Sequence, residues 1–353
     1  MSLLLVEDDF QAQELFRTAI KEFNEDNSAD IKFVGCSSVD EAIENLKGYS
    51  FDGAIIDLNL GDQSDGGNQV ADQIKNTLNR IPIVFVTGTP DAVQTEGIPL
   101  IDIYTRDEVS YREVIDELFS IYKTGLTRIM GGAGVIEEKL SRIFIDNLLP
   151  QRKSWIEYAK GDPLNTEKAY LRHALNHLLQ DLDVDIDKCH PEELYIYPPI
   201  SNRINTGSIL KKKESESHFI VMSPACDLAE RENGDCNTDL ALLVEIDLFK
   251  NLFSETDLNN LSKSQEKKLG LERIYKNSKG YYHWLPFVSF FKGGVINFRK
   301  ISTYTRSELE KEFNPSPVIQ VSPSFIKDIV SRFSSYYARQ GQPDINYQKF
   351  LNS

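Results

Sequence analysis

The sequence predicts a parallel α/β domain over residues 1–125 and an α+β region after it. Short apolar runs alternate with segments of helical periodicity throughout the first 125 residues. This alternation is typical of right-handed βαβ units around a sheet that is buried on both faces. Beyond Pro191 the runs are short, aromatic or β-branched, and Gly, Pro and Asn separate them. That texture favours a mainly antiparallel sheet or a small barrel.

The first domain is expected to alternate strands with helices. The expected strands are apolar runs, and IPIVFVT is the most β-branched of them. The expected helices repeat apolar residues at spacings of three and four, and Ser38 or Asp40 can cap the second helix. The strands are Ser2–Val6, Ile31–Val34, Gly53–Leu58, Ile81–Thr87 and Ile98–Tyr104, and the helices are Phe10–Phe23, Val39–Leu46, Gly67–Leu78 and Ser110–Tyr122.

The rest of the chain is expected to hold a helical linker at residues 126–190 and an output or interaction domain at residues 191–353. A glycine-rich joint, Thr124–Gly134, opens the linker, and Asn165 or Thr166 can cap its second helix. The expected helices are Val135–Leu149, Thr166–Leu182, Leu252–Tyr275 and Ser324–Tyr337, and the expected strands are Leu194–Tyr197, Phe219–Met222, Leu240–Ile246, Tyr281–Phe291 and Val295–Phe298.

Charge is shared unevenly along the chain. The formal net charge is -15, and residues 1–125, with 9 Lys+Arg and 24 Asp+Glu, carry the whole imbalance. An acidic domain repels phosphate backbones, and the neutral remainder has one short basic run at 211–213. Nucleic acid is therefore disfavoured as a partner.

The sequence also predicts a cytoplasmic protein without a membrane partner. No apolar run reaches the roughly 18 residues that a membrane span requires. The first residues, MSLLLVEDD, do not fit a secretory signal, because acidic residues follow a very short apolar run. Four cysteines, at positions 36, 189, 226 and 236, show no paired close spacing, which fits a reducing compartment better than a disulfide framework.

Polar side chains end three of the expected parallel strands. Glu7 and Asp8 end the first strand, Asp57 the third and Thr87 the fourth. Ligands bind beyond the carboxyl ends of the strands in open parallel sheets. Clustered carboxylates repel one another unless a cation joins them, and hard oxygen ligands suit Mg²⁺. A carboxylate in such a site can accept a phosphoryl group, and the Thr87 hydroxyl can donate to its oxygen, with room left at Gly88.

These residues carry a resemblance to a known family. LLLVEDD, GAIIDLNLGDQSDGG and IVFVTGT make residues 1–125 resemble the receiver domain of two-component response regulators. The resemblance implies a flavodoxin-like (CheY-like) fold and phosphorylation of Asp57 by a sensor histidine kinase. It also implies Thr87 as the switch hydroxyl, and Mg²⁺ held by Glu7, Asp8, Asp57 and the backbone carbonyl of Asn59.

The chain departs from the family pattern after the fifth strand. The family has a lysine there, usually followed by proline, and Arg106 is the best match in this sequence. Arginine keeps the positive charge but is longer, planar and differently hydrated. Leu60-Gly61 replaces the usual methionine-proline, and Tyr104 is either a switch aromatic or a half-buried edge residue. These changes bear on the output switch more than on the acceptor, and an unphosphorylated pseudo-receiver stays open as an alternative.

The second half offers a weaker candidate site around the turn MSPACDL. Cys226 can be a nucleophile beside Asp227 with His218 or His283 as its base, or it can simply pack in a core. Arg339 can pair with a carboxylate or stabilise a helix carboxyl end. A metal site would draw on Cys189, His190, Cys226 and Cys236, and the carboxylates in reach of Arg339 would be Asp227 or Asp344.

Three functions remain open at this level. The first is a response regulator with an atypical, non-DNA-binding output region, because no helix-turn-helix, cyclase or Walker motif is found. The second is a phosphate sink, and the chain resembles the buffering receivers of bacterial antiphage (Detocs-like) two-component systems. The third is a phosphorylation-gated enzyme using Cys226 and Asp227. The expected partners are a histidine kinase and a second regulator or effector, and a homodimer is left open. The turn SPACDL together with RQGQPD resembles an uncharacterised bacterial domain without an assigned activity.

Overall fold

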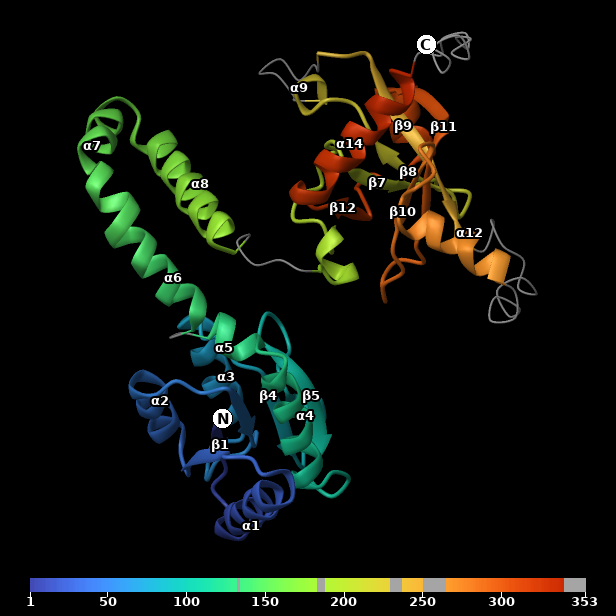
Figure 1. The fold of residues 1–353 in the computed structure, drawn as a ribbon. Coiled ribbons are helices and arrows are strands. Elements are labelled where there is room, and N and C mark those ends of the chain that lie inside the picture. Colours follow the sequence, from blue (N-terminus) through green and yellow to red (C-terminus); the bar gives the residue numbers. More distant parts are fainter. Residues whose placement is uncertain (132–133, 183–187, 229–236, 250–264, 340–353) are drawn as a thin grey trace, which may run out of the picture. The chain divides into compact units, whose positions relative to one another are not determined.

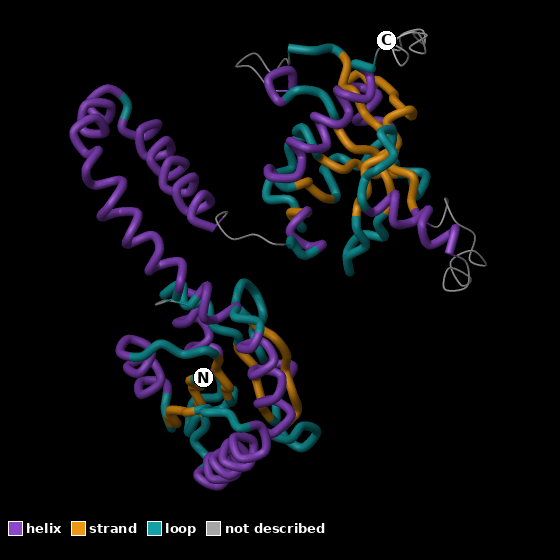
Figure 2. The backbone as a smooth tube through the Cα atoms, viewed as in Figure 1, coloured by secondary structure: helices purple, strands orange, loops and turns teal. Residues whose placement is uncertain are grey.

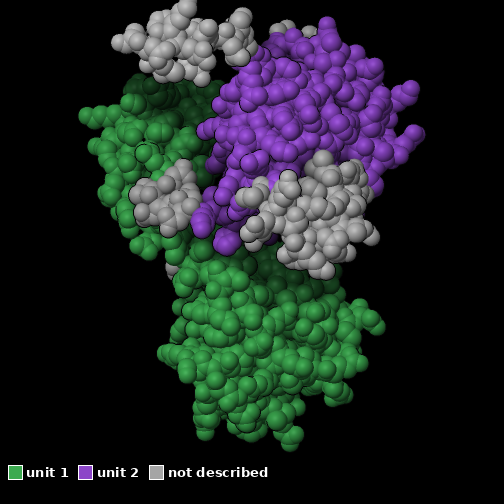
Figure 3. Space-filling model, turned by 45° about the vertical axis from the view of Figure 1, so that its right-hand side comes forward, with its two compact units in different colours: residues 1–185 green, residues 186–353 purple. Residues whose placement is uncertain are grey.

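The chain forms two compact units, residues 1–185 and 186–353 (Figures 1 and 3). The computed structural model describes residues 1–131, 134–182, 188–228, 237–249 and 265–339. Within these residues no helix combines the length and the apolar character needed to cross a membrane.

The first unit is built on a parallel sheet with the strand order β2-β1-β3-β4-β5. This is the order of flavodoxin and CheY, so the predicted flavodoxin-like class is confirmed. Every expected strand is present, and no end differs from the prediction by more than two residues. The strands are β1 (Ser2–Val6), β2 (Lys32–Cys36), β3 (Gly53–Ile56), β4 (Ile83–Thr87) and β5 (Leu100–Thr105).

Helices cover both faces of this sheet. Phe16 of α1 and Leu118 of α4 pack with one face, whereas Val39 of α2 and Val70 of α3 pack with the other. Ser38 caps α2 by accepting a hydrogen bond from the Glu41 N–H, as one of the two predicted caps requires. The helices are α1 (Phe10–Asn27), α2 (Val39–Gly48), α3 (Gly66–Asn76) and α4 (Tyr111–Lys123).

The connection from β4 to β5 has one turn of 3-10 helix, Pro90–Ala92, where parallel crossovers usually carry an α-helix. The buried Asn68 of α3 holds this segment. Its Nδ2 donates to the Ala92 carbonyl at 3.2 Å, and its Oδ1 accepts from the Gln94 N–H at 3.0 Å. These two hydrogen bonds fix the position of the loop that connects β4 to β5.

A helical hairpin follows the sheet. A π-helical turn (Phe144–Leu148) and a 3-10 turn (Leu149–Gln151) join α6 to α7, and α8 folds back beside them (Figure 2). The predicted cap of α8 was wrong, because α8 starts at Pro163 and the Asp162 carboxylate accepts from the Asn165 N–H at 3.1 Å. The helices are α5 (Leu126–Met130), α6 (Val135–Ile143), α7 (Arg152–Gly161), which was not predicted, and α8 (Pro163–Leu182).

The second unit is built on an antiparallel sheet with the order β10-β11-β9-β8-β7-β12-β6. The prediction of a mainly antiparallel sheet is confirmed. The strands β7 and β12 were not predicted. The observed β11 is much longer than the predicted strand, because Arg299-Lys300 interrupts its apolar run. The strands are β6 (Tyr195–Ile196), β7 (Ser208–Lys211), β8 (His218–Val221), β9 (Leu240–Leu248), β10 (Tyr282–Leu285), β11 (Gly294–Thr305) and β12 (Ile319–Val321).

The long helix α14 (Pro323–Tyr337) closes the core of this sheet, where Ile329 is fully buried and Phe333 packs against Phe298. The shorter helices are α9 (Ala225–Leu228), α12 (Gln265–Tyr275) and α13 (Arg306–Glu312). The predicted helix before residue 265 lies outside the described residues.

The single basic run of the second unit is paired with acidic side chains. Lys211 contacts Glu216 and Lys212 contacts Glu312, each at 2.8 Å. The ion pairs neutralise most of the patch that could have attracted a phosphate backbone.

Candidate functional site

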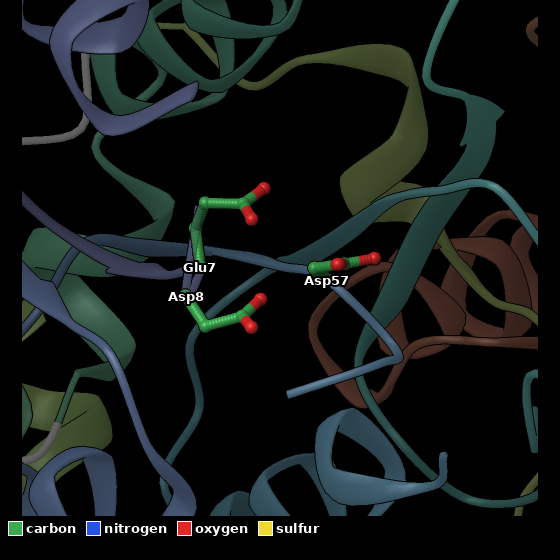
Figure 4. A group of neighbouring side chains, drawn as sticks. All are labelled: Glu7, Asp8 and Asp57. Atoms are coloured by element: carbon green, nitrogen blue, oxygen red, sulfur yellow. The ribbon is translucent and has the colours of Figure 1, made fainter. Parts of the chain in front are cut away.

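Three carboxylates meet at the carboxyl edge of the first sheet. Glu7 and Asp8 follow β1, and Asp57 follows β3, whose Ile56 pairs with Val6 in parallel register. One oxygen from each of the three side chains lies within 4.8 Å of the others. Figure 4 shows Glu7 and Asp8 projecting from one strand end toward Asp57.

Two of these carboxylates are buried. Glu7 is 2% exposed and Asp57 is 6% exposed, whereas Asp8 is exposed. Burial raises the pKa of Asp57, and the positive charge of Arg106 only partly opposes this shift. Burial likewise raises the pKa of Glu7, although the hydrogen bond from the Asp9 N–H and the positive charge of Arg106 both lower it. The folded chain therefore holds ionised carboxylates here at a cost in free energy.

Arg106 reaches into the acidic site from the loop after β5. Its Nη2 donates to Glu7 Oε2 and to Asp57 Oδ2, both at 2.7 Å. The sequence predicted a cation near Asp57 at this position, and the structure adds that the guanidinium bridges two carboxylates. The Arg106 side chain is 35% exposed, so part of it is open to solvent.

The loops after β3 and β4 are hydrogen-bonded beside the acidic site. Thr87 is fully buried, and its hydroxyl accepts from the Thr89 N–H at 3.3 Å. Asn59 Nδ2 donates to the Thr89 hydroxyl at 3.3 Å. A Cβ placed on Gly88 would meet no atom within 4 Å, so space is open next to Thr87.

The residues present fit a hard divalent cation. Three carboxylates face one guanidinium, which leaves two negative charges. The Asp57 Oδ1 atom is buried and has no hydrogen-bond partner among the described residues, and Asp8 Oδ2 is held by the Gly61 N–H at 2.9 Å. Carboxylate oxygens are the ligands that Mg²⁺ prefers, so the donor set suits Mg²⁺.

Gly67 positions Asp57 and was missed as a site residue. Its N–H donates to the Leu58 carbonyl at 2.9 Å. A Cβ on Gly67 would lie 2.3 Å from the Asp57 carbonyl oxygen and 2.8 Å from Leu58 Cα. The Gly66-Gly67 pair within the quoted motif was the available signal. Nothing in the pattern pointed to Asn68.

No protein-family model and no curated protein matches the chain, whereas some solved structures are similar to about a third of it. Among solved structures, the N-terminal domain of a response regulator/sensory box/GGDEF protein from Carboxydothermus hydrogenoformans is 17% identical over 35% of this chain and 98% of its own, with a TM-score of 0.30. A CheY-like receiver domain from Methylobacillus flagellatus is 24% identical over 34% and 98%, with a TM-score of 0.29.

A third match is a response regulator from Thermotoga maritima in complex with Mg(2+)-BeF, 17% identical over 35% of this chain and 96% of its own, with a TM-score of 0.27. Residues 1–125 resemble a response-regulator receiver domain. The strand order shows the flavodoxin-like fold independently of these structures. We use the label receiver domain for residues 1–125 on account of this similarity.

The buried charge of Asp57 in the receiver domain predicts a pH-dependent gain in stability for Asp57→Asn. The amide oxygen can still accept from Arg106, and no hydrogen bond to Oδ1 is lost. Because burial raises the pKa of Asp57, the wild type is favoured below the unfolded pKa and loses that stability as pH rises through the folded pKa. We expect Asp57→Asn to raise Tm by a few degrees at pH 7, with the difference vanishing below about pH 4.

Thermal unfolding at several pH values measures this effect. Asp62→Asn, an exposed carboxylate in the loop after β3, is the matched control and should leave Tm unchanged. A lower Tm for Asp57→Asn at pH 7 would contradict the assignment of a costly buried charge.

The candidate residues of the second unit lie on separate parts of its sheet. Cys226 is exposed in α9, beyond the end of β8, and its Sγ is 3.7 Å from Asp227 Oδ1. His218 begins β8, at the end away from Cys226. His283 lies on β10, three strand spacings or roughly 14 Å across the sheet from β8. The strand register therefore keeps both histidines apart from the thiol.

The remaining candidates are also dispersed. Arg339 lies over the ring of Tyr336, after the end of α14. His283 is buried with its Nδ1 3.8 Å from Asp328, and burial lowers its pKa to about 4. Cys189 is exposed, and the His190 N–H donates to Glu193 in a local turn. Cys236 and Asp344 lie outside the described residues.

Proposed function

We propose that the receiver domain accepts a phosphoryl group on Asp57 from the phosphohistidine of a sensor histidine kinase. The proposal rests on the hydrogen bonds and charges around Asp57. One oxygen of its carboxylate accepts from Arg106, and the other is buried and has no hydrogen-bond partner within the described part of the chain. Glu7 and Asp8 complete a site of three carboxylates. The Asp57 carboxylate is therefore a nucleophile that lies next to the positive charge of Arg106 and next to two carboxylates that can bind a metal ion.

The transfer exchanges one bond at phosphorus for another. An oxygen of Asp57 forms a bond to phosphorus while the P–N bond of the donor breaks, and the departing imidazole nitrogen keeps the electron pair and takes up a proton. The Arg106 guanidinium and the Thr87 hydroxyl can then donate hydrogen bonds to oxygens of the new phosphoryl group. Mg²⁺ bound by Glu7, Asp8, Asp57 and the Asn59 carbonyl would neutralise charge on the donor and the acceptor.

Labelling of the full chain with acetyl phosphate and Mg²⁺ tests the proposal. Intact-mass spectrometry should show one added phosphoryl group on the wild type and on Asp62→Asn. Asp57→Asn should show none. Equal labelling of wild type and Asp57→Asn would defeat the assignment of the acceptor.

A phosphate sink is a second candidate, and the segment between β4 and β5 favours it. This segment follows Thr87 directly, and Asn68 pins it at Ala92 and Gln94. Because these hydrogen bonds hold the segment next to the acceptor, they limit the conformational change by which a phosphorylated receiver would act on an output region. A buffering receiver of this kind is the antiphage alternative.

Competition for a phosphorylated kinase distinguishes the two candidates. A sink at excess concentration should drain the phosphoryl group from a second regulator, whereas its Asp57→Asn variant should not. Phosphorylation that changes hydrogen exchange of the β4–β5 segment would instead favour a signalling output.

A further inference from the structure

The surface of the helical hairpin, which we define as residues 135–182, is unusually apolar. It carries ten of the 23 large apolar side chains that are exposed among the described residues. Neither α7 nor α8 contains a buried residue. Helices with this composition are normally covered on one side. The ten are Phe144, Ile145, Leu149, Ile156, Tyr158, Leu164, Leu171, Leu175, Leu179 and Leu182, which are between 43% and 71% exposed.

The exposed side chains of α8 form a stripe along one side of the helix. Leu164, Leu171, Leu175 and Leu182 are separated by seven, four and seven residues. This spacing places them on one face, as at the seam of a helix bundle. The stripe runs nearly the whole length of α8.

The other half of the hairpin adds an apolar side chain to the same side. Ile156 lies on α7, and together with Leu171 it lines a shallow groove between α7 and α8. Ile156 and the α8 stripe therefore lie on the same face of the hairpin, which we call the hairpin face.

We propose that the hairpin face binds the hairpin face of a second copy of this chain, giving a four-helix bundle. A face with apolar side chains from two helices is complemented by two helices that carry the same side chains, and a two-fold axis supplies them. The five side chains of this face, each about half exposed, leave on the order of 500 Å² of apolar surface in water, close to the apolar share, about 60%, of the roughly 800 Å² per partner of a stable interface.

The described helices of the second unit are less suited to cover this face. The longest of them, α14, already buries Ile329 and packs Phe333 and Tyr336 against its own sheet. A second copy is therefore the best complement that the described residues offer.

Sedimentation equilibrium of the full chain tests the proposal. The wild type should have twice the 40.2 kDa mass of one chain. The double substitution Leu171→Glu and Leu175→Glu places charge on the hairpin face and should halve that mass. Leu78→Glu, at a position 81% exposed in the receiver domain, is the matched control and should stay dimeric.

Circular dichroism of the double variant should match the wild type, because both substituted positions are exposed. A wild type that is monomeric up to tens of micromolar would overturn the proposal, including the case in which the second unit covers the face. A double variant that remains a dimer would overturn it as well. Both outcomes are independent of phosphorylation at Asp57.

Discussion

Gly67→Ala is expected to destabilise the receiver domain by about 3 kcal/mol and to abolish most phosphorylation of Asp57. The added Cβ would lie 2.3 Å from the Asp57 carbonyl oxygen, a distance that backbone atoms cannot accept. Either α3 or the end of β3 must move, and both core packing and the acceptor position depend on that contact. Chemical unfolding measures the stability loss, and acetyl phosphate labelling measures the effect on Asp57.

Gly48→Ala is the matched control for this effect. A Cβ on Gly48 would meet no atom within 4 Å, and the residue ends α2. We expect its stability to differ from the wild type by less than about 1 kcal/mol, because alanine is favoured over glycine in a helix. Equal stability of Gly67→Ala and Gly48→Ala would show that the close approach of α3 to β3 is not required.

Arg106→Ala is expected to lower stability at pH 7 by about 2 kcal/mol and to increase stabilisation by Mg²⁺. The substitution leaves Glu7 and Asp57 without their shared cation. Breaking a buried pair costs about 3–5 kcal/mol, and the partial exposure of Arg106 reduces this figure. Because the guanidinium occupies two of the carboxylate oxygens, its removal should leave them free for a divalent ion. Mg²⁺ titration followed by Tm measures both effects.

Arg112→Ala is the control for loss of one positive charge. Arg112 pairs with Asp26 at 2.6 Å on the surface, and both side chains are about half exposed. Such pairs contribute at most about 1 kcal/mol, and Mg²⁺ should act on this variant as on the wild type. Equal Mg²⁺ responses of Arg106→Ala and the wild type would show that Arg106 does not compete for the site.

The contacts of Arg106 differ from those that a lysine could make at this position. Lysine would place a point charge here, whereas the guanidinium of Arg106 bridges Glu7 and Asp57 through one nitrogen. Arg106→Lys should therefore retain labelling of Asp57 while showing a Mg²⁺ response between those of the wild type and Arg106→Ala.

The sequence by itself determined the parallel sheet of the receiver domain and the meeting of its polar strand ends. Apolar runs and helical periods are local patterns, and side chains at the carboxyl ends of parallel strands must share one edge. For this reason the sequence alone predicts that Glu7, Asp57 and Thr87 lie at one edge of the sheet. The antiparallel character of the second sheet was likewise predicted, although β7 and β12 were not.

The tertiary structure alone decided which atoms meet at that edge and which surfaces stay open. Arg106 and Glu7 are separated by 99 residues, and the backbone approach of Gly67 to Asp57 depends on how α3 packs against β3. The periods of α6 to α8 indicate apolar faces without indicating whether anything covers them. Contacts of this kind arise from packing between distant segments, so local sequence patterns do not specify them.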